Sequence, residues 1–259
     1  MKLKRWQCVA GVCVAVAGLA GCMGPTALKP MLQDSDGYSA RYFSHEMLAP
    51  AARKTLPAPG AEPLGFKRLT AKGEVEVSGT SLPDPHRHMV FEHTLINDRD
   101  DGMVRGIERR SVDGLPYLIL FWSSYRGVAT LSVQRGVPAR NQAAPISSVR
   151  SISDWKSMAN MQEHTVYDYT INYGYGDPLM PSAKVERRCT SGTFYDAGKF
   201  LSGLAGQAID LNCDDINGSG AKTSESQFVW LAQYGVVLVT KITALNGVTT
   251  LKYDSVTTQ

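Results

Sequence analysis

Two short runs of charged residues have the composition of an anion-binding site. Glu108-Arg109-Arg110 and Glu186-Arg187-Arg188 each place a carboxylate beside two guanidinium groups. A guanidinium group is planar and always charged, and it suits paired contacts with carboxylate or phosphate oxygens. The first interpretation of the runs is a Glu-Arg ladder on a solvent-facing sheet surface, where each pair contributes only about a few tenths of a kcal/mol. The alternative is two related sites for anions such as phosphate or lipid A sugars, at Arg109, Arg110, Arg187 and Arg188.

Histidines and aspartates give weaker indications of a metal site. His86 and His88 share one strand face, whereas His93 has the opposite parity and lies among apolar residues, so the three do not converge on zinc. The acidic loops at 98–102 and 214–218 lack EF-hand spacing and have the composition of hairpin turns. We predict no metal site and no cofactor.

The sequence lacks the common motifs of nucleophilic catalysis and phosphate binding. No serine lies in a G-x-S-x-G motif, and there is no G-x-x-x-x-G-K or G-x-G-x-x-G phosphate loop. A pair of carboxylates brought together by the fold would leave no sequence motif, so a hydrolase stays the third alternative. We expect a non-catalytic protein.

The amino-terminal segment carries an export signal. Lys2, Lys4 and Arg5 precede an apolar run at 9–19 that is too short to span a bilayer, and Leu19-Ala20-Gly21-Cys22 follows. These four residues resemble the lipobox of bacterial lipoproteins. The resemblance implies removal of the signal peptide 1–21 and attachment of diacylglycerol and further acyl chains such as palmitate to Cys22. An ordinary secretory signal is the alternative.

The resemblance also implies a location. Lipoproteins that stay in the inner membrane tend to have aspartate after the lipidated cysteine, and here that residue is Met23. We therefore expect a lipid anchor in the outer membrane with the protein facing the periplasm, and inner-membrane retention as the alternative. Without the three basic residues of the segment 1–21, the chain carries 24 basic and 24 acidic residues, which gives no support to nucleic-acid binding.

Processing also determines which cysteines remain for a disulfide. Of five cysteines, Cys8 and Cys13 leave with the signal and Cys22 is lipidated. In an oxidising compartment the remaining pair, Cys189 and Cys213, predicts one structural disulfide. A redox-active pair is the alternative, but no C-x-x-C motif is present.

The mature chain divides into a tether and a folded domain. Residues 22–65 contain six of the thirteen prolines and predict a lipidated, flexible tether, interrupted at 38–54 by an apolar island in which Ser44 would cap a short helix. Residues 66–259 alternate polar and apolar side chains at 74–77, 89–95, 104–109, 128–133 and 165–173, which is typical of antiparallel strands. Short helices are predicted at 154–162, capped by Ser153, and at 197–204, capped by Asp196.

The carboxyl-terminal region predicts a hairpin with a defined register. Asn246-Gly247 separates apolar-rich runs at 236–245 and 248–256 and is a strong signal for a two-residue turn. That turn would place Ile242 opposite Leu251 and Lys241 opposite Lys252.

Two segments of the sequence match each other and indicate an internal repeat. Ile107-Glu108-Arg109-Arg110 with Gly114 and Tyr117 recurs as Val185-Glu186-Arg187-Arg188 with Gly192 and Tyr195 at identical spacing. Similar residues upstream and downstream extend the match to 86–135 and 162–245, with an insertion near 196–226 in the second copy.

Together these features predict a mainly β fold. We expect antiparallel meanders in tandem that form a curved sheet or flattened barrel with one or two short helices. The first functional hypothesis is a lipoprotein with a binding or envelope-assembly role, whose partner is an envelope protein or a lipid. The second is a carrier of a hydrophobic ligand, for which an apolar cavity would be the distinguishing feature.

Overall fold

The computed structural model describes residues 26–79, 86–175 and 182–259. Its elements in chain order are β1 (Thr26–Ala27), α1 (Lys29–Gln33), α2 (Ser35–Tyr42), η1 (His45–Met47), α3 (Pro50–Arg53), β2 (Arg68–Ser78), β3 (His86–Ile96), β4 (Met103–Val112), β5 (Leu115–Tyr125), β6 (Ala129–Val137), η2 (Pro138–Arg140), β7 (Gln142–Ala143), β8 (Ser147–Ser153), β9 (Val166–Tyr175), β10 (Ala183–Asp196), η3 (Ala197–Lys199), β11 (Gln207–Asn217), β12 (Lys222–Leu231), β13 (Val236–Ala244) and β14 (Gly247–Thr258).

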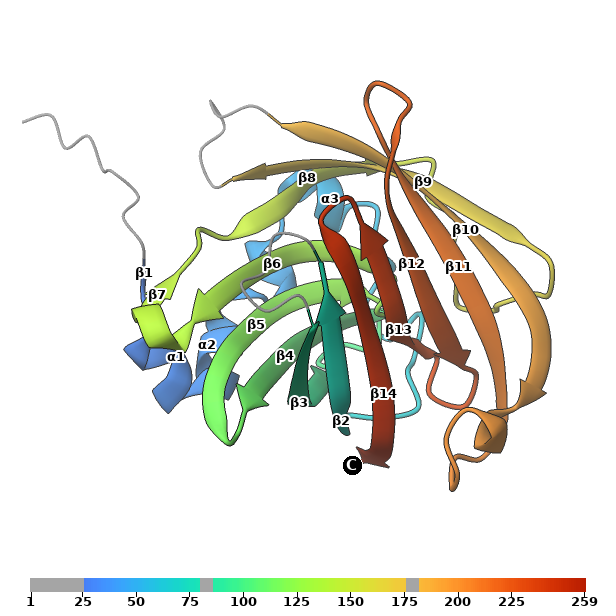
Figure 1. Ribbon diagram of the computed structural model, residues 1–259. Helices are drawn as coiled ribbons and strands as arrows, with labels where there is room; N and C mark the ends of the chain where they lie inside the picture. The colour runs from blue at the N-terminus through green and yellow to red at the C-terminus, as the bar shows by residue number, and fades with distance from the viewer. Residues whose placement is uncertain (1–25, 80–85, 176–181) are drawn as a thin grey trace, which may run out of the picture.

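The described strands form a closed antiparallel barrel. Twelve of them, β2–β6 and β8–β14, follow one another around a ring in which neighbours in sequence are neighbours in space. Strand β14 pairs with β2, and β6 pairs with β8 through Ser132 and Val133, which completes the ring (Figure 1). Strand β7 lies outside the ring between β6 and β1. The prediction of a mainly β, barrel-like fold is confirmed.

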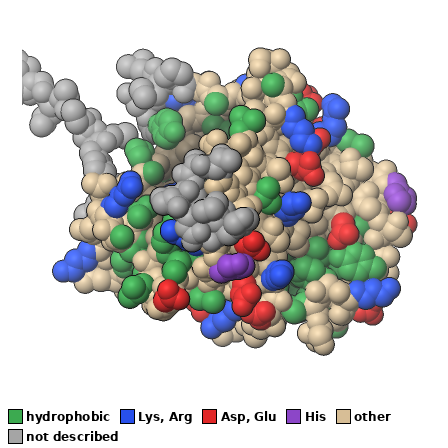
Figure 2. All heavy atoms as spheres, in the orientation of Figure 1, with side chains coloured by type: hydrophobic (Ala, Val, Ile, Leu, Met, Phe, Trp, Pro, Cys, Tyr) green, Lys and Arg blue, Asp and Glu red, His purple; other side chains and the backbone are tan. Residues whose placement is uncertain are grey.

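The alternating strand directions give the barrel two different ends. The turns β3–β4, β5–β6 and β12–β13 and the loops β8–β9 and β10–β11 lie at one end, which we call the closed end. The turns β4–β5, β11–β12 and β13–β14 and the β6–β8 connection lie at the other, which we call the mouth end. On the face seen in Figure 2, basic and acidic side chains lie mixed without a large patch of one sign.

The prediction of a flexible tether is wrong for the part of 22–65 that the structure describes. Helices α1 and α2 pack against the outside of β4 and β5, with α1 and α2 lying beside these strands in Figure 1. Leu28, Met31 and Phe43 are fully buried there, and burial of each such side chain contributes about 1.5–3 kcal/mol. Proline content indicated a coil, but these apolar side chains outweigh it. No helix in the described part of the chain is both long and apolar enough to cross a bilayer.

The predicted helices are shorter than expected or are not formed. Ser44 precedes the single 3-10 turn η1 but makes no capping hydrogen bond. At 154–162 there is no helix, because Ser157 and the backbone of Met158 bond instead to other loops of the closed end. Asp196 does cap a helical turn through the Gly198 amide, yet η3 ends after three residues.

The terminal hairpin forms with a register two residues from the predicted one. Ile242 lies opposite Thr249, not Leu251, and Lys241 lies opposite Thr250, not Lys252. The two turn residues are Leu245 and Asn246, since Ala244 pairs with Gly247. Gly247 serves a different purpose from the predicted one: a Cβ there would lie 2.1 Å from the Ser78 carbonyl oxygen, so glycine permits the approach of β2.

The two halves of the proposed sequence repeat have different structures. Gly114 lies in the β4–β5 turn, whereas its counterpart Gly192 lies inside β10 at an irregularity of the β10–β11 pairing. Strands β4 and β10 run in opposite directions, but β5 and β12, which carry the matching Trp122 and Trp230, run in the same direction. The segments 86–135 and 162–245 are therefore not equivalent meanders, because the insertion adds one strand, β11.

The predicted disulfide is confirmed. Cys189 of β10 and Cys213 of β11 are bonded, and they lie directly opposite each other in the strand pairing. Both are buried among the apolar side chains of the largest core cluster. The bond therefore fixes the register of the added strand within the barrel wall.

Candidate functional site: a chamber inside the barrel

The barrel wall surrounds a partly open chamber of about 270 Å³. Its wall comes from strands on both sides of the ring and is mainly apolar; Leu95, Leu120, Trp122, Phe228, Val239 and Ile242 are among its members. On β4 and β5 alternate residues face this chamber, and those between them, such as Ile107 and Phe121, face the covering helices. The two-residue period of the strands thus separates a lumen from a second, outer core.

A polar cluster interrupts the apolar wall on β3 and β4. Glu108 is buried and accepts a hydrogen bond from Nε of Arg110, two residues along the same strand. His93 is 5% exposed, and its Nδ1 lies 3.9 Å from Oε2 of Glu108. Neither nitrogen of His93 has a hydrogen-bond partner among the described residues. Burial lowers the pKa of His93, so the imidazole is neutral at pH 7 and presents an unsatisfied polar group to the chamber.

An ion pair lies on the opposite wall. Nε and Nη2 of Arg187 donate to the two carboxylate oxygens of Asp215 at 2.6 and 2.7 Å. Nη1 donates to the Val128 carbonyl oxygen at 2.6 Å, which connects β10 to the start of β6. Ser224 donates a further hydrogen bond to Asp215 at 2.8 Å. These three hydrogen bonds use donors on every nitrogen of Arg187 and tie β10 to β11 and β6, so the side chain holds the wall together.

A second cavity of about 290 Å³ lies at the mouth end and continues from the chamber. The two cavities share Arg110 and Leu120. The second is lined in addition by Arg87 of β3 and Arg135 of β6, and Arg87 lies over the ring of Tyr117 at 4.9 Å. The chamber is therefore approached past three arginines.

Of the predicted anion-site residues, the structure brings two into the lumen and leaves two outside. Arg110 and Arg187 line the chamber, and Arg109 and Arg188 lie on the outer surface. There Arg109 is 3.7 Å from Glu92, and Arg188 is 3.2 Å from Glu186, as expected of a solvent-facing ladder. The ladder interpretation is wrong for the inner residues. That interpretation assumed that the sheet face carrying Glu108 and Arg110 is exposed to solvent, whereas closure of the ring places this face inside the barrel.

Sequence reasoning missed Arg87 and Arg135. Each lies two positions from an inward-facing residue and so on the same strand face, Arg87 with Met89 and Arg135 with Val133. That parity was available in the sequence, but only closure of the ring shows that the two side chains approach one cavity.

The residues considered for metal binding remain apart. His88 is exposed on the outside of β3, His93 is inside, and the side chain of His86 lies outside the described residues. The aspartates of the β3–β4 turn pair with basic side chains, namely Asp98 with Arg105, Asp100 with Lys67 and Asp101 with Arg99. Within the described ranges, no group of three His, Cys, Asp or Glu residues is arranged to hold a metal ion.

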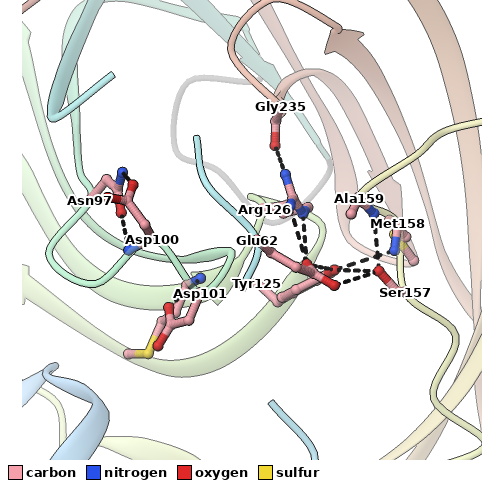
Figure 3. A network of polar contacts seen from close by, with 11 residues as sticks. Glu62, Asn97, Asp100, Asp101, Tyr125, Arg126, Ser157, Met158, Ala159 and Gly235 are labelled. Carbon is pink, nitrogen blue, oxygen red and sulfur yellow. Dashed lines mark hydrogen bonds and ion pairs between the residues drawn. The ribbon is translucent and has the colours of Figure 1, made fainter. Parts of the chain in front are cut away.

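A hydrogen-bonded network around Glu62 joins the loops at the closed end (Figure 3). Glu62 accepts from the Tyr125 hydroxyl, from Ser157 Oγ at 2.6 Å and from Nε and Nη2 of Arg126 at 3.2 and 3.1 Å. Nη1 of Arg126 donates to the Gly235 carbonyl oxygen at 2.9 Å. The network joins the segment before β2 to the β5–β6, β8–β9 and β12–β13 connections, so it holds the loops of this end together.

Protonation of His93 is expected to destabilise the protein in acid. Because its pKa is lower in the folded state, the unfolded chain binds the proton more tightly, and stability falls as the pH drops below about 6.5, the ordinary imidazole value. The limiting slope of this loss is about 1.4 kcal/mol for each pH unit. Urea unfolding of the wild type and of His93→Leu at several pH values measures it, since the variant lacks this dependence.

His88→Leu provides the matched control for this measurement. His88 lies on the same strand with an exposed side chain, so this variant should follow the wild-type pH profile. Parallel profiles for the wild type and His93→Leu would contradict the assignment of acid sensitivity to the chamber.

The predicted lipidation site, Cys22 of Leu19-Ala20-Gly21-Cys22, lies outside the described residues, as does the signal segment 1–21. Comparison of the chain with protein-family models, with curated proteins and with solved structures finds no match.

Proposed function

We propose that this chain is a non-catalytic carrier of the bacterial envelope that binds one small hydrophobic ligand inside its barrel. The observation that carries the proposal is the chamber with its apolar wall and its continuation to the mouth end. Its volume of about 270 Å³ lies at the lower limit of pockets that bind small molecules, about 300–1,000 Å³. For a role in envelope assembly through a protein partner, the described residues offer no comparable site.

The lipobox adds a location to the proposal. Acylated Cys22 would anchor the barrel at the outer membrane, facing the periplasm, with several acyl chains giving stable attachment. The protein would then exchange its ligand close to a lipid surface. Mass spectrometry of the amino-terminal peptide after expression in a bacterium would detect the diacylglycerol on Cys22, and an unmodified cysteine would contradict the anchor.

The chamber is tested with a neutral apolar probe, N-phenyl-1-naphthylamine, whose fluorescence rises in apolar surroundings. We expect saturable binding by residues 23–259, because the lining of the chamber is mainly apolar. Val239→Trp fills the chamber and is expected to weaken binding by about tenfold or more, a difference of about 1.4 kcal/mol.

Val90→Trp is the matched control, since Val90 is 55% exposed on the outside of β3. Thermal unfolding of both variants verifies that the barrel is intact. Absence of saturable probe binding, or equal binding by the two variants, would contradict the carrier function.

A further inference from the structure

The three arginines at the mouth end form an unusual surface for the entrance of an apolar chamber. Arg87, Arg110 and Arg135 come from β3, β4 and β6 and line one cavity of about 290 Å³. The other described residues of its lining are Val77, Met89, Tyr117, Leu118, Leu120 and Thr249, none of which is acidic. Entry into the barrel therefore passes a concentration of positive charge.

The described residues neutralise little of this charge. Arg110 is bonded to Glu108 through Nε, and no hydrogen bond of its terminal nitrogens appears in the described part of the chain. Neither Arg87 nor Arg135 takes part in an ion pair between described residues. Like charges around one partly enclosed cavity repel one another, and a bound anion would relieve that repulsion.

The arginines also differ in how they are held. Arg110 is fixed by Glu108, and its side chain is only 13% exposed. Arg87 is supported by the Tyr117 ring, a cation–π contact that leaves the edge of the guanidinium free to donate. Arg135 is exposed and is the most accessible of the three. This arrangement offers donors at successive depths along the path into the chamber.

From these contacts we propose that the ligand is a single-chain amphiphile whose carboxylate or phosphate head binds Arg87, Arg110 and Arg135 at the mouth while its apolar chain lies in the chamber. The inference rests on the proposed carrier function and specifies its ligand. A methylene group occupies about the same volume as a water molecule, about 30 Å³. The chamber of about 270 Å³ therefore holds about nine methylene groups. A ten-carbon acid fits this length, with its carboxylate outside the chamber.

The test compares decanoate with decanol, which has the same chain and no charge. Displacement of N-phenyl-1-naphthylamine by each compound gives the two affinities. We expect the wild type to prefer decanoate by about tenfold or more, since hydrogen bonds to charged groups each contribute about 1.5–3 kcal/mol. In the double variant Arg87→Gln/Arg135→Gln, the ratio of the two affinities is expected to fall to about one to three.

Arg109→Gln/Arg188→Gln is the matched control. These arginines lie on the same strands as Arg110 and Arg187 but on the outer surface, so the same change of net charge leaves the mouth intact. A wild-type affinity ratio close to one, or an equal fall of the ratio in the control variant, would overturn the proposal. Arg110 is left unchanged because its loss would also release the buried Glu108.

Decyl phosphate distinguishes the two sources of the anion. Tighter binding of decyl phosphate than of decanoate would identify a phosphorylated lipid as the ligand class, and the reverse would identify a free fatty acid; either supports recognition of an anionic head. If the neutral probe binds and neither anion displaces it better than decanol does, the carrier function stands and this inference fails. If the neutral probe does not bind, both fail.

Discussion

Replacing Asp215 with alanine is expected to lower the free energy of unfolding by about 3–5 kcal/mol, the usual cost of removing one partner from a buried ion pair. Arg187 would then keep its charge inside the barrel with no carboxylate partner among the described residues. Burial by itself would raise the pKa of the Asp215 carboxyl, but the hydrogen bonds and charge of Arg187 outweigh it, and the net pKa is lowered. The pair is thus ionised at pH 7, and urea unfolding at that pH measures its loss.

Asp214→Ala is a closely matched control. Asp214 is the preceding residue on β11, its side chain is 45% exposed, and it pairs with Lys222 at the surface. We expect the control to lose about 1 kcal/mol or less, as is typical of exposed pairs. Replacing both inner partners, as in Arg187→Met/Asp215→Leu, is expected to be much less damaging than Asp215→Ala alone. An equal loss in Asp214→Ala and Asp215→Ala would show that burial of the ion pair does not determine its contribution.

Replacing Glu62 with alanine is the second change with a large expected effect. Arg126 is 2% exposed and has no other carboxylate partner among the described residues, so its charge would be left buried. The hydrogen bonds from Tyr125 and Ser157 would be lost as well. We expect the free energy of unfolding to fall by about 3–5 kcal/mol, measured by urea denaturation.

Glu92→Ala serves as the comparison for Glu62→Ala. Glu92 also contacts two basic side chains, Lys72 at 3.0 Å and Arg109 at 3.7 Å, but on the exposed outer surface. Its loss is expected to cost about 1 kcal/mol or less. If Glu62→Ala is no more destabilising than Glu92→Ala, the network at the closed end is not what holds its loops together.

The strands were predictable from sequence because their two-residue period repeats over many residues. The alternation at 89–95 and 165–173 corresponds to β3 and β9, and the Asn246-Gly247 signal correctly indicated a hairpin. Its register was not predictable, since contact with Ser78 of β2 determines where the turn residues lie. The helix expected at 154–162 failed for a related reason: hydrogen bonds to residues distant in sequence replace those within a helix.

The site was predictable only in part. The sequence placed Glu108 and Arg110 on one strand face and His93 among apolar residues, and the structure has both arrangements. It did not indicate which face would be enclosed, because that depends on closure of the ring by strands far apart in the chain. Arg87 and Arg135 lie 48 positions apart, and nothing local to either residue indicates that they line the same cavity.

Strands β2 and β14 are the first and the last strand of the barrel along the described chain, and they pair with each other. Gln259 donates to the Arg68 carbonyl oxygen at 2.8 Å and accepts from the Lys67 amide at 2.8 Å, so the residue after β14 takes part in this junction. A chain made from its amino end presents an unpaired strand edge on β2 until the final strand has been synthesised. Unpaired edges recruit strands from other molecules. Partly synthesised chains are therefore the form of this protein most prone to aggregation, and loss of β14 would leave that vulnerability in the finished molecule.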